Sequence, residues 1–385
     1  MRGLENGRNQ NNLNSQNELL KSIHLAYICL NKAIMIRSFI TNIILLFLCN
    51  AAIAQYKVEL LDSSNFKLGE GVILSKTSFR GLSVVDDQTI WVIGSKGTIA
   101  KSHDGGKTFE FKQLKGYERS DFRDIEAFDD KRAIMLSSGT PAYILKTIDG
   151  GQTWKEVYKN LDTAYFLDAM DFWDETRGIL VADPKHGHFV LLQTKDAGEN
   201  WQELDTNHTP KAMEGEAVFA ASGTSLRCTS DSIVAFVSGG TSSNFYYSKS
   251  NGLNWINKKS KIIQGQNSQG MFSFIFNSPE NNMVGIGGDY LRDTIRMKNV
   301  IFWDVIKNKS HTSMNSITSY KSCFENLKFI HNEISCGTDG VEMLDYKKPY
   351  WYKVSSESFN VVRKAKKGNA VFLAGGKGRI SRLVY

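Results

Sequence analysis

The sequence predicts an all-β protein, a β-propeller of seven four-stranded blades. A short phrase recurs four times at intervals of 45, 47 and 54 residues, and a blade of four strands has about that length. Each copy lies between two short strand-like runs, and long helical periodicity is absent. The chain that follows a predicted signal peptide divides into seven units of roughly 47 residues. The spacing alone leaves six or eight blades open, because the fifth and sixth units lack the phrase.

The first 54 residues contain a predicted secretory signal. Residues 1–34 are polar and rich in Asn and Gln, and we expect them to be disordered or to precede the true start of translation at Met35. Residues 35–54 run from a charged start through an apolar stretch to Ala-Ile-Ala, the pattern of a cleaved signal peptide. The sequence therefore predicts a secreted or periplasmic protein whose signal ends at Ala54 and whose mature chain begins at Gln55.

Two other interpretations of this segment are weaker. A membrane anchor needs an apolar run of about 20 residues, and the run here is shorter. Lipidation at Cys49 requires a small residue before the cysteine, and Leu48 stands there. We therefore expect no integral membrane span after signal cleavage.

The mature chain is only mildly basic. The whole sequence has 47 Lys and Arg against 40 Asp and Glu, and residues 1–54 hold five and two of these, which leaves 42 against 38 and a net charge of +4. Nucleic-acid binding calls for basic residues clustered on one face, so no nucleic-acid partner is expected. Cys323 and Cys336 either form a disulfide across neighbouring strands or are two buried free thiols.

The seven units are placed by the apolar starts of their first strands. These lie at Phe79, Phe122 and Phe166 in three aligned units, and near Glu216, Met271, Cys323 and Phe359 in the later ones. The last unit has room for only three strands before the chain ends at Tyr385. We expect residues 56–61 of the mature N-terminus to supply the fourth, which closes the ring and removes an exposed edge.

The repeated phrase is predicted to be a hairpin turn. It reads Ser-His-Asp-Gly-Gly-Lys-Thr-Phe at 102–109, Thr-Ile-Asp-Gly-Gly-Gln-Thr-Trp at 147–154, Thr-Lys-Asp-Ala-Gly-Glu-Asn-Trp at 194–201 and Ser-Lys-Ser-Asn-Gly-Leu-Asn-Trp at 248–255. The Asp side chain accepts backbone N–H groups, the Gly supplies a positive φ, and the closing aromatic packs against neighbours. The residues in these structural roles are Asp104, Gly106, Asp149, Gly151, Trp154, Asp196, Gly198, Trp201, Gly252 and Trp255. A calcium site is not expected, since each copy offers at most one carboxylate.

The phrase resembles the Asp-box, or bacterial neuraminidase repeat, of sialidases and of many non-enzymatic propellers. The wider text from Trp91 to Thr108 is similar to secreted bacterial propellers related to photosystem II stability and assembly factors, which are often labelled oxidoreductases. The resemblance covers residues 56–385. It implies a propeller that serves as a scaffold.

The candidate binding site is the mouth at which the first strands begin. Arg80 and Arg123 occupy the same slot in consecutive units, and the residues expected with them are Asp124, Glu126, Asp168, Asp171, Glu216, Asp183, Asp289 and Arg292. One hypothesis is a mixed-charge site that recognises an anionic or sugar-like group through bidentate arginines. The alternative is that these charges pair with one another and hold neighbouring blades together.

Two functions from different classes follow. The first is a non-catalytic, monomeric scaffold that binds an envelope protein or a surface glycan. The second is a sialidase-like hydrolase, for which the resemblance implies three arginines on the substrate carboxylate, a Tyr nucleophile with a Glu partner and an Asp acid/base. Phe79 and Arg80 lie where sialidases have a Phe/Tyr-Arg-Ile-Pro phrase that carries their first arginine. A second and a third arginine cannot be assigned. A cofactor-dependent oxidoreductase agrees less well with the sequence, because no G-x-G-x-x-G opens a helix and no redox Cys motif is present. We expect neither a cofactor nor a metal.

Overall fold

The computed structural model describes residues 56–385 except for six short gaps at 230–231, 278–281, 306, 308, 313–318 and 346–347. Of the predicted leader and signal peptide, it describes residues 21, 25, 30, 32 and 34–37, all helical; the rest of both segments lies outside the described residues. Within the described residues no helix combines the length and the apolar character needed to cross a bilayer.

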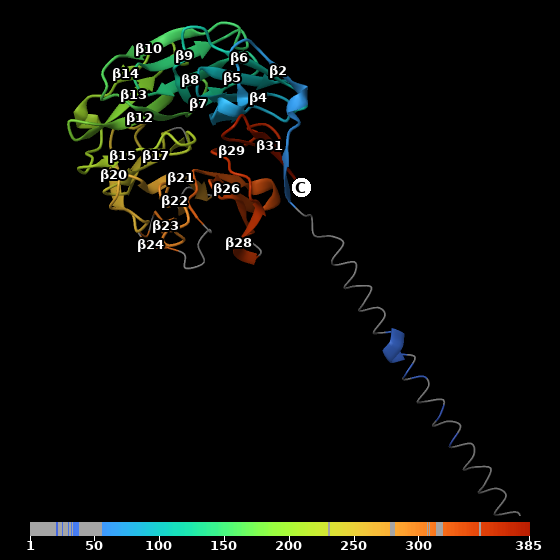
Figure 1. Cartoon of the computed structure of the whole chain (residues 1–385). Coiled ribbons are helices and arrows are strands. Elements are labelled where there is room, and N and C mark those ends of the chain that lie inside the picture. The colour runs from blue at the N-terminus through green and yellow to red at the C-terminus, as the bar shows by residue number, and fades with distance from the viewer. Residues whose placement is uncertain are drawn as a thin grey trace, which may run out of the picture. The chain divides into compact units, whose positions relative to one another are not determined.

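Residues 56–384 form a seven-bladed β-propeller, as predicted (Figure 1). Blade 1 contains β3 (Phe79–Val84), β4 (Ile90–Gly94), β5 (Thr98–Ser102) and β6 (Phe109–Gln113), with β2 (Phe66–Leu68) added in parallel to β6. Blade 2 contains β7 (Asp121–Ala127), β8 (Ala133–Ser138), β9 (Ala142–Thr147) and β10 (Lys155–Asn160). Blade 3 contains β11 (Leu167–Phe172), β12 (Gly178–Lys185), β13 (His188–Thr194) and β14 (Gln202–Glu203).

The second half of the ring is less regular. Blade 4 contains β16 (Leu226–Cys228), β17 (Val234–Val237), β19 (Asn244–Ser248) and β20 (Ile256–Lys259). Blade 5 contains β21 (Gln269–Asn277), β22 (Asn282–Asp289), β23 (Val300–Asp304) and β24 (Lys309–Thr312), extended by β18 (Gly239–Gly240) and β15 (Glu216–Ala217). Blade 6 contains β25 (Cys323–Leu327), β26 (Asn332–Gly337), β27 (Gly340–Asp345) and β28 (Lys348–Ser355). The helices that the structure describes within residues 56–385 are the 3₁₀ turns η1 (Ser63–Asn65), η2 (Leu74–Lys76), η3 (Thr206–His208) and η4 (Lys328–Ile330).

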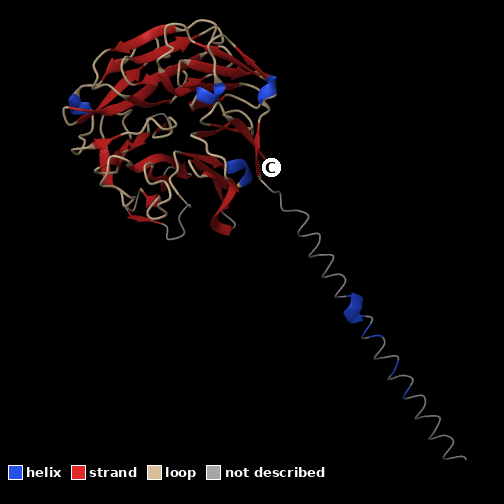
Figure 2. Cartoon of the chain, viewed as in Figure 1, coloured by secondary structure: helices blue, strands red, loops and turns tan. Residues whose placement is uncertain are grey.

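The two ends of the propeller meet in blade 7, as predicted. This blade contains β29 (Val361–Lys364), β30 (Val371–Ala374), β31 (Ile380–Val384) and, as its outermost strand, β1 (Lys57–Leu60). Figure 2 shows that strands make up nearly all of the regular structure. Tyr56, Val58 and Leu61 pack against the core shared by blades 7, 1 and 6, so the N-terminal strand adds apolar burial as well as hydrogen bonds.

The four repeated phrases form the same turn between the third and fourth strands of blades 1 to 4. In the second copy the Asp149 carboxylate accepts from the backbone N–H of Thr153 at 3.0 Å and from the Thr147 hydroxyl at 2.8 Å. The same contacts recur at Asp104 and Asp196, and Ser250 keeps the backbone contact to Asn254. The Thr153 hydroxyl and backbone N–H, followed by the Thr147 hydroxyl, lower the pKa of Asp149 to about 2.

The phrase also joins neighbouring blades. Gly151 has a φ of +81°, and a Cβ there would lie 3.0 Å from the Trp91 ring of the preceding blade. The Trp154 ring packs edge-on against the same Trp91 ring. The glycine is therefore needed both for the turn conformation and for close approach to the neighbour.

The prediction that the fourth unit begins at Glu216 is wrong. The first strand of blade 4 begins at Leu226, and Glu216 lies in β15, a two-residue strand that pairs with β18. The difference arises because blade 4 is preceded by an insertion. The interval of 54 residues between the third and fourth phrases already contained this extra length.

Candidate functional site

A ring of hydrogen bonds links the seven first strands around the central channel. Each strand uses one side chain to contact the backbone of the first strand in the next blade. The seven contacts join Ser83 to Ala127, Asp124 to Met170, Asp171 to Cys228, Arg227 to Phe274, Ser273 to Phe324, Cys323 to Val362, and Arg363 to Leu82. The chemistry changes from interface to interface, but every interface has such a contact between its two first strands.

This ring assigns a structural role to two residues predicted for the mouth. Asp124 accepts from the Met170 N–H at 2.8 Å, and Asp171 accepts from the Cys228 N–H at 2.7 Å. Both carboxylates thus hold neighbouring blades together, but through backbone N–H groups and not through the charge pairs that the alternative expected. Such a role is invisible in the sequence, because Ser, Asp, Arg and Cys all fill the equivalent position.

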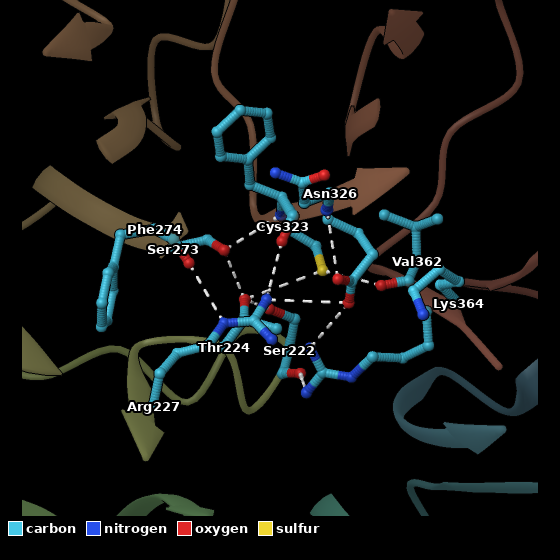
Figure 3. Close-up of polar contacts among 12 residues, drawn as sticks. Ser222, Thr224, Arg227, Ser273, Phe274, Cys323, Asn326, Val362 and Lys364 are labelled. Atoms are coloured by element: carbon cyan, nitrogen blue, oxygen red, sulfur yellow. Dashed lines mark hydrogen bonds and ion pairs between the residues drawn. The ribbon is translucent and has the colours of Figure 1, made fainter. Parts of the chain in front are cut away.

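A buried segment, residues 218–225, fills the channel, and we name it the plug. Arg123 of blade 2 donates to the Ala220 carbonyl at 3.1 Å, and Arg363 of blade 7 donates to the Ser222 carbonyl at 3.3 Å. Figure 3 shows Ser222 and Thr224 of the plug near Ser273 and Cys323, with Thr224 donating to the Ser273 hydroxyl at 2.6 Å. Because the plug bonds to several blades, it fixes the channel interior.

Cavities lie on both sides of the plug, and their lining sets share no residue. One cavity of about 490 Å³ opens where the first strands begin, and we name it the aromatic mouth. The other, of about 210 Å³, opens where the first strands end, and we name it the charged mouth. Since strands alternate in direction, the four phrase turns lie on the side of the charged mouth.

Rings from three parts of the chain form one wall of the aromatic mouth. Phe219 of the plug stacks on Phe272 of blade 5 at a centroid separation of 3.9 Å. Tyr290 contacts both rings edge-on, and Tyr320 contacts Phe272 in the same way. Tyr290 is 44 % exposed, so this wall remains open to a ligand.

The two arginines at this mouth have different environments. Arg123 is paired with Asp121 at 2.8 Å, donates to the plug and lies over the Phe166 ring. Arg80 lines the same cavity, and among the residues that the structure describes no carboxylate or carbonyl pairs with its guanidinium. Burial, followed by the positive charge of Arg123, lowers the pKa of Arg80. Arg80 is therefore a partly buried cation that forms no ion pair with a described residue, and the Asp121 carboxylate, which is paired with Arg123, acts on its charge only through space.

Two acidic residues lie near the same mouth. Asp183 lines the cavity and accepts from the Val218 N–H at 3.1 Å, and burial raises its pKa to about 6. Asp168 is fully buried, and burial together with the charge of Asp183 raises its pKa well above the usual range. The structure thus brings Arg80, Arg123 and Asp183 together, with Asp168 buried close by.

The other predicted site residues lie elsewhere. Asp124, Glu126 and Asp171 line the charged mouth, where Glu126 pairs with Lys366. Glu216 is buried and accepts from the Tyr246 hydroxyl at 2.9 Å and from the Asn244 amide at 2.8 Å.

Asp289 and Arg292 form a pair in the loop that follows β22. The Asp289 carboxylate is buried and accepts from the Arg292 guanidinium at 2.9 Å. Burial opposes its ionisation, but side-chain donors that include Gln269 outweigh burial and lower the pKa of Asp289 to about 2. The pair holds the loop that carries Tyr290.

The pH dependence of the free energy of unfolding should reveal the protonation of Asp124 in the folded protein. Burial raises the pKa of Asp124 to about 7, against about 3.9 in an unfolded chain. The folded state therefore binds more protons between these values, and the free energy of unfolding falls as pH rises from about 4 to about 7. We expect the Tm of Asp124→Asn, measured relative to the unmodified chain, to increase across this window. A constant difference would show that Asp124 is ionised in the folded protein throughout.

Among the described residues, the lining of neither mouth combines three arginines with a Tyr–Glu pair and an Asp. Tyr246, which donates to Glu216, lies in the core shared by blades 3 and 4, and burial and the charge of Glu216 raise the pKa of Tyr246. In the described part of the chain no group of three His, Cys, Asp or Glu is placed to hold a metal. Cys323 and Cys336 are register partners on β25 and β26, and both are free thiols.

Two features of the site were not found from the sequence. The plug could have been suspected from the longer interval before blade 4 and from its small residues at 220–225. The aromatic wall had no local signal, because its four rings come from segments up to about 100 residues apart that meet only in the ring.

Comparison with known proteins supports the fold. The family model described as the DUF6242 beta propeller domain matches residues 31–382. Among solved structures, "YCF48 bound to D1 peptide" is 14% identical, with a TM-score of 0.60 over 86% of this chain and 97% of that chain. "YCF48 from Cyanidioschyzon merolae" is 13% identical, with a TM-score of 0.56 over 86% of this chain and 98% of that one.

A WD40 propeller has a similar fold. The WD40 beta propeller domain of Doa1 is 10% identical, with a TM-score of 0.59 over 86% of this chain and 97% of that chain. At these identities the likeness shows the fold alone. No curated protein matches the chain.

Proposed function

The chain belongs to the DUF6242 β-propeller family, and we propose that it is a non-catalytic binding module whose aromatic mouth holds an anionic segment of a partner protein. The partner belongs to the cell envelope, and the module acts as a scaffold. The repeated turns are, in this proposal, diverged Asp-boxes that keep only their structural role.

The observation that carries the proposal is the unpaired Arg80 guanidinium. A partly buried cation without an ion pair is unfavourable, and the second cation at Arg123 has a larger effect on its pKa than the Asp121 carboxylate, which acts in the opposite direction. An incoming carboxylate would be held by charge-assisted hydrogen bonds and would remove this cost. The adjacent rings supply apolar surface for the rest of the segment.

The solved structure of YCF48 bound to a D1 peptide supports a protein ligand. A propeller of this fold can therefore hold a peptide. The two proteins are only 14% identical, so the position of the D1 peptide on YCF48 does not locate the site on this chain.

Substitution of Arg80 should separate binding from stability. Peptides are selected from a random display library on the chain from Gln55 to Tyr385, and their affinities are measured by fluorescence polarisation. We expect Arg80→Met to weaken binding at least about tenfold with a Tm near that of the unmodified chain. Arg382→Met, which removes an exposed pair with Glu59 on blade 7, is the matched control. Equal affinities in all three chains, or selection of no peptide, would contradict the proposal.

The sialidase alternative is tested on the same material. Turnover of a fluorogenic sialoside that is lost in Arg80→Met would replace the scaffold proposal with a hydrolase. The proposed envelope location rests on the predicted signal at residues 35–54. Mass spectrometry of the protein from its native cell should find a mature chain that begins at Gln55, whereas an intact signal segment would contradict secretion.

A further inference from the structure

We propose that the aromatic mouth recognises a zwitterionic partner segment, with an ammonium group against Asp183 and the ring wall and a carboxylate at Arg80. This inference rests on the proposed function and adds a second, oppositely charged element to it. The ammonium group belongs to a lysine side chain or to the N-terminus of a chain.

The cavity carries opposite charges on different blades. Arg80 is on β3 of blade 1, and Asp183 is on β12 of blade 3, and both line the same space of about 490 Å³. A purely anionic ligand would meet Asp183 as a like charge. A ligand that carries both signs satisfies the two ends of the cavity at once.

Asp183 has capacity to bind a cation. The Val218 N–H donates to Oδ1 of Asp183. The other oxygen, Oδ2, does not accept from this N–H, and the Asp183 side chain lines the cavity. Its acidic neighbour Asp168 is fully buried, and burial and the charge of Asp183 raise the pKa of Asp168, so the neutral form of Asp168 is favoured and Asp183 is the carboxylate left to bind a cation. With a pKa of about 6, Asp183 is largely ionised at neutral pH.

The ring wall favours an ammonium group at this place. Val218, which binds Asp183, directly precedes Phe219, so the carboxylate and the Phe219–Phe272 stack are adjacent. Tyr290 and Tyr320 add edge-on contacts to the same stack. A carboxylate beside several rings is the arrangement in which cation–π attraction and ion pairing act together.

Small probes of defined charge test the proposal on the chain from Gln55 to Tyr385. The probes are ω-amino carboxylates with four, six and eight carbons, and the matched alkyl carboxylates without the amine. Dissociation constants come from chemical-shift titration or calorimetry. We expect the best amino carboxylate to bind at least about fivefold more tightly than its amine-free counterpart. This advantage should vanish in Asp183→Asn, while Arg80→Met should weaken both probes.

The outcomes are distinguishable. If the amine-free acids bind as tightly as the amino acids and lose affinity in Arg80→Met, the zwitterion inference fails and the proposed function stands. If no probe responds to Arg80→Met, both fail. Tyr290→Ala provides a second readout that does not touch Asp183, and an unchanged preference for the amine in this variant would also overturn the inference. Peptides with a free or acetylated N-terminus, and with lysine or acetyl-lysine, then identify the source of the ammonium group.

Discussion

Removal of the N-terminal strand should abolish stable folding. A chain that begins at Ser63 lacks β1, so blade 7 retains three strands and β31 presents an open edge. The loss includes the β1–β31 hydrogen bonds, the burial of Tyr56, Val58 and Leu61, and the Arg382–Glu59 pair. Together these should cost on the order of 5 kcal/mol, which is comparable with the whole stability of many domains.

The matched control is the chain that begins at Gln55, which keeps β1 and removes only the predicted leader and signal. Thermal unfolding followed by circular dichroism compares the two chains. We expect the control to unfold cooperatively and the shorter chain to be aggregated or to melt at least about 10 °C lower. Equal Tm values would show that β1 does not close the ring.

Substitution in the plug should have the second large effect. Gly223 has a φ of +69°, and a Cβ at this position would overlap the Asp124 carboxylate. Gly223→Ala therefore combines backbone strain with displacement of a side chain that bridges blades 2 and 3. We expect a loss of about 3 kcal/mol in the free energy of unfolding, measured by urea denaturation.

Gly376→Ala is the control, because Gly376 has no positive φ and a Cβ there meets no atom within 4 Å. It should unfold at nearly the same urea concentration as the unmodified chain. The double variant Gly223→Ala/Asp124→Ser should cost less than the sum of its two single substitutions, since the smaller Ser removes the overlap. Strict additivity would show that the plug does not press on Asp124.

The fold could be predicted because its determinants are local and repeated. Asp104, Asp149 and Asp196 each accept hydrogen bonds within their own turn, so eight consecutive residues are enough to predict their role. The closure by β1 was also predictable, since a blade with three strands needs a fourth. The plug interrupts this regularity, and it displaced the predicted start of blade 4 from Leu226 to Glu216.

The site was harder to predict because it depends on which end of each first strand a side chain occupies. Arg80 and Asp124 lie near the starts of two first strands in the sequence, yet they line opposite mouths once the plug divides the channel. Asp171 and Glu216 have the residue type of a ligand-binding group, but a backbone N–H or a tyrosine already satisfies them. Composition does not separate a paired charge from an unpaired one such as Arg80.

Hydrogen–deuterium exchange with a library-selected peptide tests the central claim most directly. If the aromatic mouth is the binding site, the peptide should slow exchange in residues 217–221 and 289–292, and it should leave residues 170–171 and 363–366, which line the charged mouth, unchanged. Arg80→Met should remove this protection. Protection confined to the segments of the charged mouth would contradict the proposed site.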